Sequence, residues 1–171
     1  MPKRAAPAAR GKDAASAGRA HDWCVKPARS HPDIVDRQGH VVILVEDDDG
    51  LRGALERVLR ASGFEAQAYA SGEAALADHG SDWADCLVVD LNLPAMSGLD
   101  LVDHIRQRGV TAPVVMITAN DEPHVRDQVQ RRGVEHFLAK PFPGSALVRL
   151  LDGAIARHRA TVAAARSPGA G

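Results

Sequence analysis

The sequence has few aromatic residues, few cysteines and no long apolar segment, and each shortage excludes a class of protein. Aromatic residues make up only 4% of the chain, so its core must be built mainly from aliphatic side chains. The two cysteines, Cys24 and Cys86, lack any metal-ligand spacing, and we interpret both as reduced thiols. No apolar run approaches the roughly 18 residues that a membrane-spanning helix needs. The basic N-terminus lacks the apolar region of a secretory signal, so we expect a cytoplasmic protein without a membrane partner.

Glycine-rich phosphate-binding motifs are also missing. The chain contains neither Gly-x-Gly-x-x-Gly nor Gly-Lys-Ser/Thr, so a dinucleotide site lacks support and a P-loop is excluded. The eight histidines show no ligand spacing. The formal net charge is only -1, which gives no reason to expect direct binding of nucleic acid.

Charge is distributed unevenly along the chain. Residues 1–40 carry eight Lys/Arg and four Asp/Glu, residues 41–155 carry ten and eighteen, and residues 156–171 carry three Arg and no acid. We interpret residues 1–40 as a disordered basic extension and residues 157–171 as a flexible tail, with one domain over residues 41–156. The alternative is a basic arm that contacts a partner or the acidic domain. Trp23 within it is either a short docking element or incidental.

Apolar periodicity predicts alternating strands and helices. Runs at residues 41–45, 87–89 and 114–117 predict buried strands, and residues 65–69 and 137–139 are weaker candidates. Helical stripes are centred on residues 51–59, 101–105 and 147–155, with a short helix near 72–78 and a thinly apolar one near 122–132. Five β-α units predict a doubly wound α/β fold with a five-stranded parallel sheet.

Several other polar residues are interpreted as helix caps or as solvent-exposed residues without a role in a site. Asp48 or Asp49 caps the first helix, while Arg52, Arg57 and Arg60 face away from its apolar stripe. The acids Asp78, Asp82 and Asp85 are interpreted as solvated residues of a polar loop, and His124 and His136 as surface residues.

Residues that suit phosphate chemistry stand at the carboxyl ends of four predicted strands. They are Glu46 and Asp47 after the first strand, Asp90 after the third, Thr118 after the fourth and Lys140 after the fifth. Ligands bind at such strand ends in doubly wound sheets, so we expect these side chains to converge. Clustered carboxylates repel one another, and Mg²⁺, which prefers oxygen ligands, relieves that repulsion. A lysine and a hydroxyl suit phosphate, so we predict an acyl phosphate formed on Asp90.

Four motifs, in this order and at these separations, resemble the receiver domain of bacterial response regulators. They are VEDD at 45–48, VDLNLPAMSG at 89–98, ITA at 117–119 and KPF at 140–142. The resemblance implies the flavodoxin-like, CheY-like (βα)5 fold with sheet order 2-1-3-4-5. It also implies two-component signalling, in which a sensor histidine kinase donates the phosphoryl group.

The resemblance assigns roles around the predicted metal. Asp90 matches the phosphoacceptor, and Asp47 matches a direct ligand of Mg²⁺. Glu46, where an Asp is commoner, matches the outer-shell partner of that ligand. The backbone carbonyl of Asn92 matches the third protein ligand.

Further roles concern the phosphoryl oxygens and the switch. Thr118 and Lys140 match the pair that holds those oxygens, and Phe137 matches the aromatic switch. The bond between Lys140 and Pro141 is expected to be cis. Ala119 is small and leaves the phosphoryl group open to water, along a path flanked by Asn92 and Asn120.

The sequence favours a signalling protein over an enzyme that acts on outside substrates. Phosphatases of the haloacid dehalogenase type also use an Asp after a strand, but they need a second acid at the position of Asn92. Because few residues follow Ile155, we expect a stand-alone receiver that changes its fourth helix, fifth strand and fifth helix to control a protein partner. The alternatives are a relay that passes phosphate to a histidine phosphotransfer protein and an interaction module independent of phosphorylation. A phosphorylation-dependent homodimer is left open.

Overall fold

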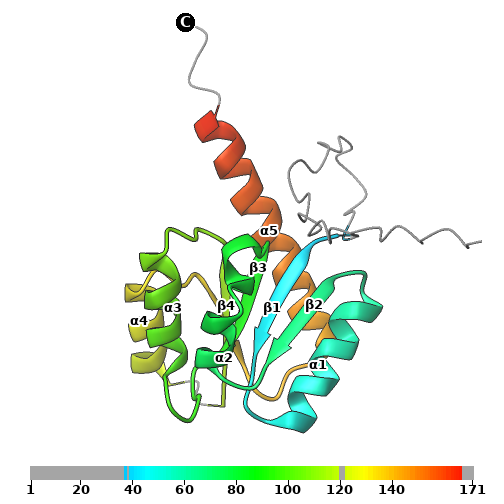
Figure 1. Cartoon of the computed structure of the whole chain (residues 1–171), viewed down its shortest axis with the longest axis vertical. Helices are drawn as coiled ribbons and strands as arrows, with labels where there is room; N and C mark the ends of the chain where they lie inside the picture. The colour runs from blue at the N-terminus through cyan, green and yellow to red at the C-terminus, as the bar shows by residue number, and fades with distance from the viewer. Residues whose placement is uncertain (1–36, 38, 120–121, 167–171) are drawn as a thin grey trace, which may run out of the picture. The chain divides into compact units, whose positions relative to one another are not determined.

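The sheet has the predicted topology. The structure, a computed structural model, describes Arg37, residues 39–119 and residues 122–166. Predictions for Trp23 and Asn120 lie outside the described residues. Five parallel strands are arranged in the order β2-β1-β3-β4-β5 (Figure 1). They are β1 (Val41–Val45), β2 (Glu65–Tyr69), β3 (Cys86–Asp90), β4 (Val114–Thr118) and β5 (His136–Ala139). The fold is therefore the flavodoxin-like α/β fold that the sequence predicts.

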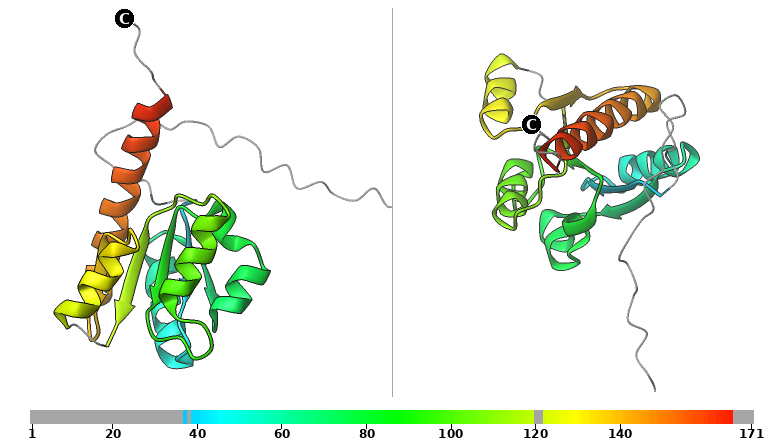
Figure 2. Two further views of the ribbon diagram at one scale, coloured as in Figure 1. Left: turned by 90° about the vertical axis from the view of Figure 1, so that its left-hand side faces the viewer. Right: turned by 90° about the horizontal axis from the view of Figure 1, so that it is seen from above.

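Helices cover both faces of this sheet (Figures 1 and 2). On one face lie α1 (Asp49–Ala61) and α5 (Gly144–Arg166), and on the other lie α2 (Gly72–Ala77), α3 (Gly98–Gln107) and α4 (Pro123–Arg131). A short 3-10 helix, η1 (Gly80–Trp83), was not predicted. None of the described helices is long and apolar enough to cross a membrane.

The apolar runs arise because the central strands are buried on both sides. In β1, Val42 and Leu44 pack in the core under α1 and α5, whereas Ile43 and Val45 pack in the core under α2, α3 and α4. Each of these four side chains is fully buried. The edge strands β2 and β5 are partly exposed, which explains their weaker apolar signal.

Helix ends show which of the candidate caps is used. The side chain of Asp48 accepts a hydrogen bond from the Leu51 amide at 2.6 Å, so Asp48 and not Asp49 caps α1. Gly63 follows the end of α1 with φ of +92°, a conformation that glycine adopts without steric cost.

Helix α5 extends into the segment expected to be a flexible tail. It continues through Arg166, whereas the tail was expected from Arg157 onward. The segment ARHRATVAAAR consists mostly of good helix formers and contains no glycine or proline. Arg159 also anchors it, because its Nη2 lies 3.5 Å from Asp85 Oδ1 at the amino end of β3. Figure 2 shows α5 extending beyond the sheet edge.

The interpretation of the loop acids as solvated is wrong for Asp85, whereas Asp78 and Asp82 are exposed as predicted. Asp85 is partly buried and accepts a hydrogen bond from the Val41 amide at 2.8 Å. Asp78 accepts a hydrogen bond from the Tyr69 hydroxyl, and burial together with this bond raises the pKa of Tyr69 to about 12. Sequence polarity does not reveal such partners, because they come from other strands.

Candidate functional site

The site begins with three acids on two neighbouring strands. Because β1 and β3 are paired, the ends of these strands place Glu46, Asp47 and Asp90 together. One carboxylate oxygen from each lies within 4.8 Å of the others. Glu46 and Asp90 are only 1% and 4% exposed, whereas Asp47 is open to solvent. The cluster is therefore buried on one side and accessible on the other.

Lys140 joins this cluster from the end of β5. Its Nζ donates hydrogen bonds to Asp90 Oδ2 at 2.5 Å and to Glu46 Oε2 at 2.7 Å. Burial opposes the charge of Lys140, but its hydrogen bonds to the two carboxylates raise its pKa overall. Burial raises the pKa of Glu46, an effect that Lys140 opposes. The bond between Lys140 and Pro141 is cis, which confirms that prediction.

Asn92 and Thr118 complete the polar floor. The Asn92 amide donates to Asp90 Oδ1 at 2.9 Å, and the Asn92 side chain donates to the Thr118 hydroxyl at 3.3 Å. Thr118 is fully buried at the end of β4. The structure thus brings together Glu46, Asp47, Asp90, Asn92, Thr118 and Lys140.

Arg52 is a site neighbour that sequence reasoning missed. Its Nη1 donates to the carbonyl oxygens of Glu46 at 2.9 Å and Asp47 at 3.2 Å, and its Nη2 pairs with Asp49. The side chain therefore turns back from α1 over the end of β1, instead of facing away as predicted. The only signal for this was its place in the first turn of a helix that directly follows the acids.

The predicted switch residue Phe137 lies apart from the acids. It is half-buried on β5 and packs against the core under α2, α3 and α4. The guanidinium of Arg126 on α4 lies 5.1 Å from the centre of its ring, a cation–π distance. Ala119, beside Thr118, is exposed.

A close backbone contact positions the loop after Asp90. The Gly98 amide donates to the Leu91 carbonyl at 2.9 Å, which joins the start of α3 to the end of β3. A Cβ atom added at Gly98 would lie only 2.1 Å from the Asp90 carbonyl oxygen. Glycine is required here because the backbone is too close for any side chain.

The donor set fits a hard divalent cation. All three clustered side chains offer oxygen, the donor that Mg²⁺ prefers. Asp47 faces solvent, which suits an ion that keeps several of its waters. No sulfur or imidazole donor belongs to this cluster within the described part of the chain.

The fold and this site together define a receiver module of two-component signalling. The family model of the response regulator receiver domain matches residues 42–152. The chain therefore belongs to the response regulator receiver domain family, a family of signalling domains.

Named relatives agree with this assignment. The sensory transduction protein RegX3 of Mycobacterium tuberculosis is 34% identical over 116 residues, which cover 68% of this chain and 51% of RegX3. The DNA-binding transcriptional regulator NtrC of Salmonella typhimurium is 32% identical over 122 residues, covering 71% and 26% respectively. The chain thus spans about half of RegX3 and about a quarter of NtrC.

A solved structure shows the same fold. The chemotaxis response regulator CheY4 of Vibrio cholerae superposes with a TM-score of 0.64 at 26% identity. The match covers 68% of this chain and 99% of CheY4.

Proposed function

We propose that Asp90 accepts a phosphoryl group from the phosphohistidine of a sensor histidine kinase, and that the phosphorylated chain controls a protein partner. The observation that carries this proposal is Lys140, which bridges Asp90 and Glu46 beside the exposed carboxylate of Asp47. A solitary acid after a strand would not need this arrangement.

In the proposed step, a carboxylate oxygen of Asp90 attacks the phosphorus atom. The new O–P bond forms as the P–N bond to the kinase imidazole breaks, and the electron pair of that bond stays on nitrogen. Mg²⁺ held by Asp47, Asp90 and the Asn92 carbonyl, with Glu46 behind them, would neutralise charge on the transferring group. Lys140 changes partner from the Asp90 carboxylate to a phosphoryl oxygen, which keeps its ammonium hydrogen-bonded throughout.

The proposed switch begins at Thr118. Its hydroxyl accepts from Asn92 in this structure and turns towards the new phosphoryl oxygens after transfer. Phe137 then turns inward and leaves the guanidinium of Arg126, which changes the face formed by α4, β5 and α5. This is a population shift between two states of the domain, driven by a local change in charge.

Phosphorylation by a small donor tests the proposal. Wild-type protein incubated with acetyl phosphate and Mg²⁺ should gain the mass of one phosphoryl group, and Asp90→Ala should gain none. Asp127→Ala, which removes an exposed acid of α4, is the matched control and should be labelled like wild type. An unlabelled wild type or a labelled Asp90→Ala protein would refute the proposal.

A metal titration separates the phosphorylation switch from an interaction module without phosphate chemistry. A functional site binds Mg²⁺ in the folded state only. The free energy of unfolding of the protein should therefore rise by about 1.4 kcal/mol when the Mg²⁺ concentration is ten times the dissociation constant. A module regulated without phosphorylation has no reason to show this rise.

A further inference from the structure

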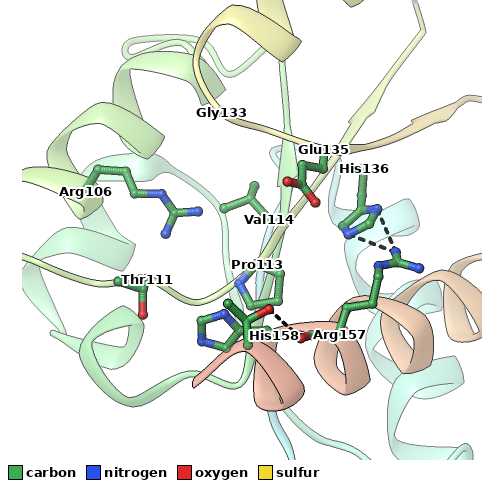
Figure 3. Close-up of a pocket in the computed structure, with 10 residues that line it drawn as sticks. Arg106, Thr111, Pro113, Val114, Gly133, Glu135, His136, Arg157 and His158 are labelled. Carbon is green, nitrogen blue, oxygen red and sulfur yellow. Dashed lines mark hydrogen bonds between the residues drawn. The ribbon is translucent and has the colours of Figure 1, made fainter. Parts of the chain in front are cut away.

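A polar cleft lies at the end of the sheet opposite the acids, near the amino ends of β4 and β5 (Figure 3). Its volume is about 230 Å³, and its lining comes from α3, the segment before β4, the segment before β5, and α5. Since a water molecule occupies about 30 Å³ of liquid, the cleft holds a tetrahedral oxyanion together with several waters.

The cleft gathers positive charge from separate segments. Arg106 on α3 and Arg157 on α5 stand on opposite sides of it, with Val114 between them (Figure 3). His136 at the start of β5 and His158 on α5 add two imidazoles. The single acid of the lining is Glu135, which is exposed and has room to turn towards solvent.

Arg106 is the most informative residue of this lining. It is half-buried, and its Nη1 donates to the carbonyl oxygens of Val110 at 2.7 Å and Ala112 at 2.8 Å. No ion pair to Arg106 is found among the described residues. Burial lowers its pKa, which reflects a charge that is poorly compensated. A partly buried guanidinium without an acid is unusual, because buried charges are generally paired.

The side chain of Arg157 has an imidazole as its hydrogen-bonding partner among the described residues. Arg157 Nη2 lies 3.2 Å from Nε2 and 3.4 Å from Nδ1 of His136, so a base and a cation face each other. His136, predicted to be a surface residue, is half-buried; burial, and then the charge of Arg157, lower its pKa, an effect that Glu135 opposes. No other partner of the Arg157 side chain is found in the part of the chain that the structure describes, so its remaining donors can bind an oxyanion, which arginine holds with two parallel hydrogen bonds.

We propose that this cleft binds a small phosphate-class oxyanion between Arg106 and Arg157. Thr111 lines the same cleft and offers a hydroxyl group to one of the remaining oxygens, whereas the Thr161 hydroxyl donates to the Arg157 carbonyl at 3.1 Å. The site is distinct from the acids around Asp90, which lie at the carboxyl ends of the strands, and it does not depend on phosphorylation there.

Titration with inorganic phosphate, followed by amide NMR of the full chain, tests this proposal. EDTA is present so that no metal bridges phosphate to Asp90, and chloride at matched ionic strength reports simple screening. We expect saturable shifts at the amides of Arg106, Gly133 and His136, with a dissociation constant on the order of 1 mM. Shifts confined to Asp90 and Thr118, or shifts that chloride reproduces, would overturn the proposal.

Variants on α5 make the test specific. Arg157→Gln removes one cation from an exposed helix position and should weaken phosphate binding about tenfold. Arg149→Gln, an equal change at an exposed position of the same helix outside the cleft, should leave binding unchanged. Arg106→Gln is less suitable because Arg106 also ties Val110 and Ala112 together. Equal binding by the Arg157 and Arg149 variants would contradict the proposed site.

Discussion

Replacing Gly98 by alanine should damage both the fold and the phosphoryl chemistry. The added Cβ would lie 2.1 Å from the Asp90 carbonyl oxygen and 2.9 Å from the carbonyl carbon. Carbon and oxygen atoms in close contact are normally about 3.3 Å apart, so the backbone must separate by about 1 Å. Neither side can yield freely, since one is the start of α3 and the other is a buried central strand. We expect a loss of about 3 kcal/mol, the upper end of typical overpacking costs.

Urea unfolding followed by circular dichroism measures this loss. With a slope of about 1.5 kcal/mol/M, the midpoint should fall by about 2 M without a change of slope. Phosphorylation by acetyl phosphate should slow by about 100-fold, because a 1 Å displacement of a reacting group has an effect of that size.

The same substitution at Gly53 is the control. There the added Cβ meets only the flexible end of Arg57 at 3.4 Å, so alanine should stabilise α1 by about 0.5–1 kcal/mol. Phosphorylation of this variant should match wild type. If Gly98→Ala unfolded at the wild-type midpoint and was phosphorylated at the wild-type rate, the close packing of α3 against Asp90 would be refuted.

Three further predictions concern single side chains. Arg52→Ala should weaken Mg²⁺ binding about tenfold in a thermal-shift titration, because it frees the Glu46 and Asp47 carbonyls, whereas Arg57→Ala should not. In a Cys24→Ser protein, Cys86 should react with a thiol reagent only after denaturation, because it is fully buried and burial raises its pKa to about 12. Labelling of Cys86 in the folded protein at pH 7 would contradict its burial. Since the pKa of Cys86 lies above the usual value, the stability due to its neutral thiol is present at neutral pH and is lost as the pH rises from about 9 to 12. Arg37→Gln should lower the free energy of unfolding by about 1 kcal/mol or less in urea unfolding, because its bidentate pair with α5 is partly exposed; a free energy of unfolding lowered by several kcal/mol would contradict this.

The central strands could be predicted because strands buried on both faces leave a continuous apolar run in the sequence. A strand covered on both faces must be apolar at every position, as Val41–Val45 is, and few other structures require that pattern. The edge strand His136–Ala139 is half-exposed throughout, so its signal is weaker. The distal part of α5 was missed because its residues bury little apolar surface, and contacts such as Arg159 with Asp85 join residues far apart in sequence.

The site was predictable for a related reason. Parallel strands end at one edge, so Asp90, Thr118 and Lys140 had to converge once their strands were placed. The turn of Arg52 over Glu46 was not predictable, because it depends on a side-chain conformation and not on periodicity. The same limit applies to the Asn92 side chain and its bond to Thr118.

Helix α5 also has a consequence as a lever. Its 23 residues form one uninterrupted helix about 35 Å long, which begins near the acid cluster and extends past the other end of the sheet. The segment from Ile155 to Arg166 extends about 16 Å, so a tilt of 10° at its base displaces its end by about 3 Å. A small tilt of α5 would therefore displace Arg166 further than it displaces the residues at the start of the helix. A partner held at that end could detect the state of Asp90 without approaching the acids.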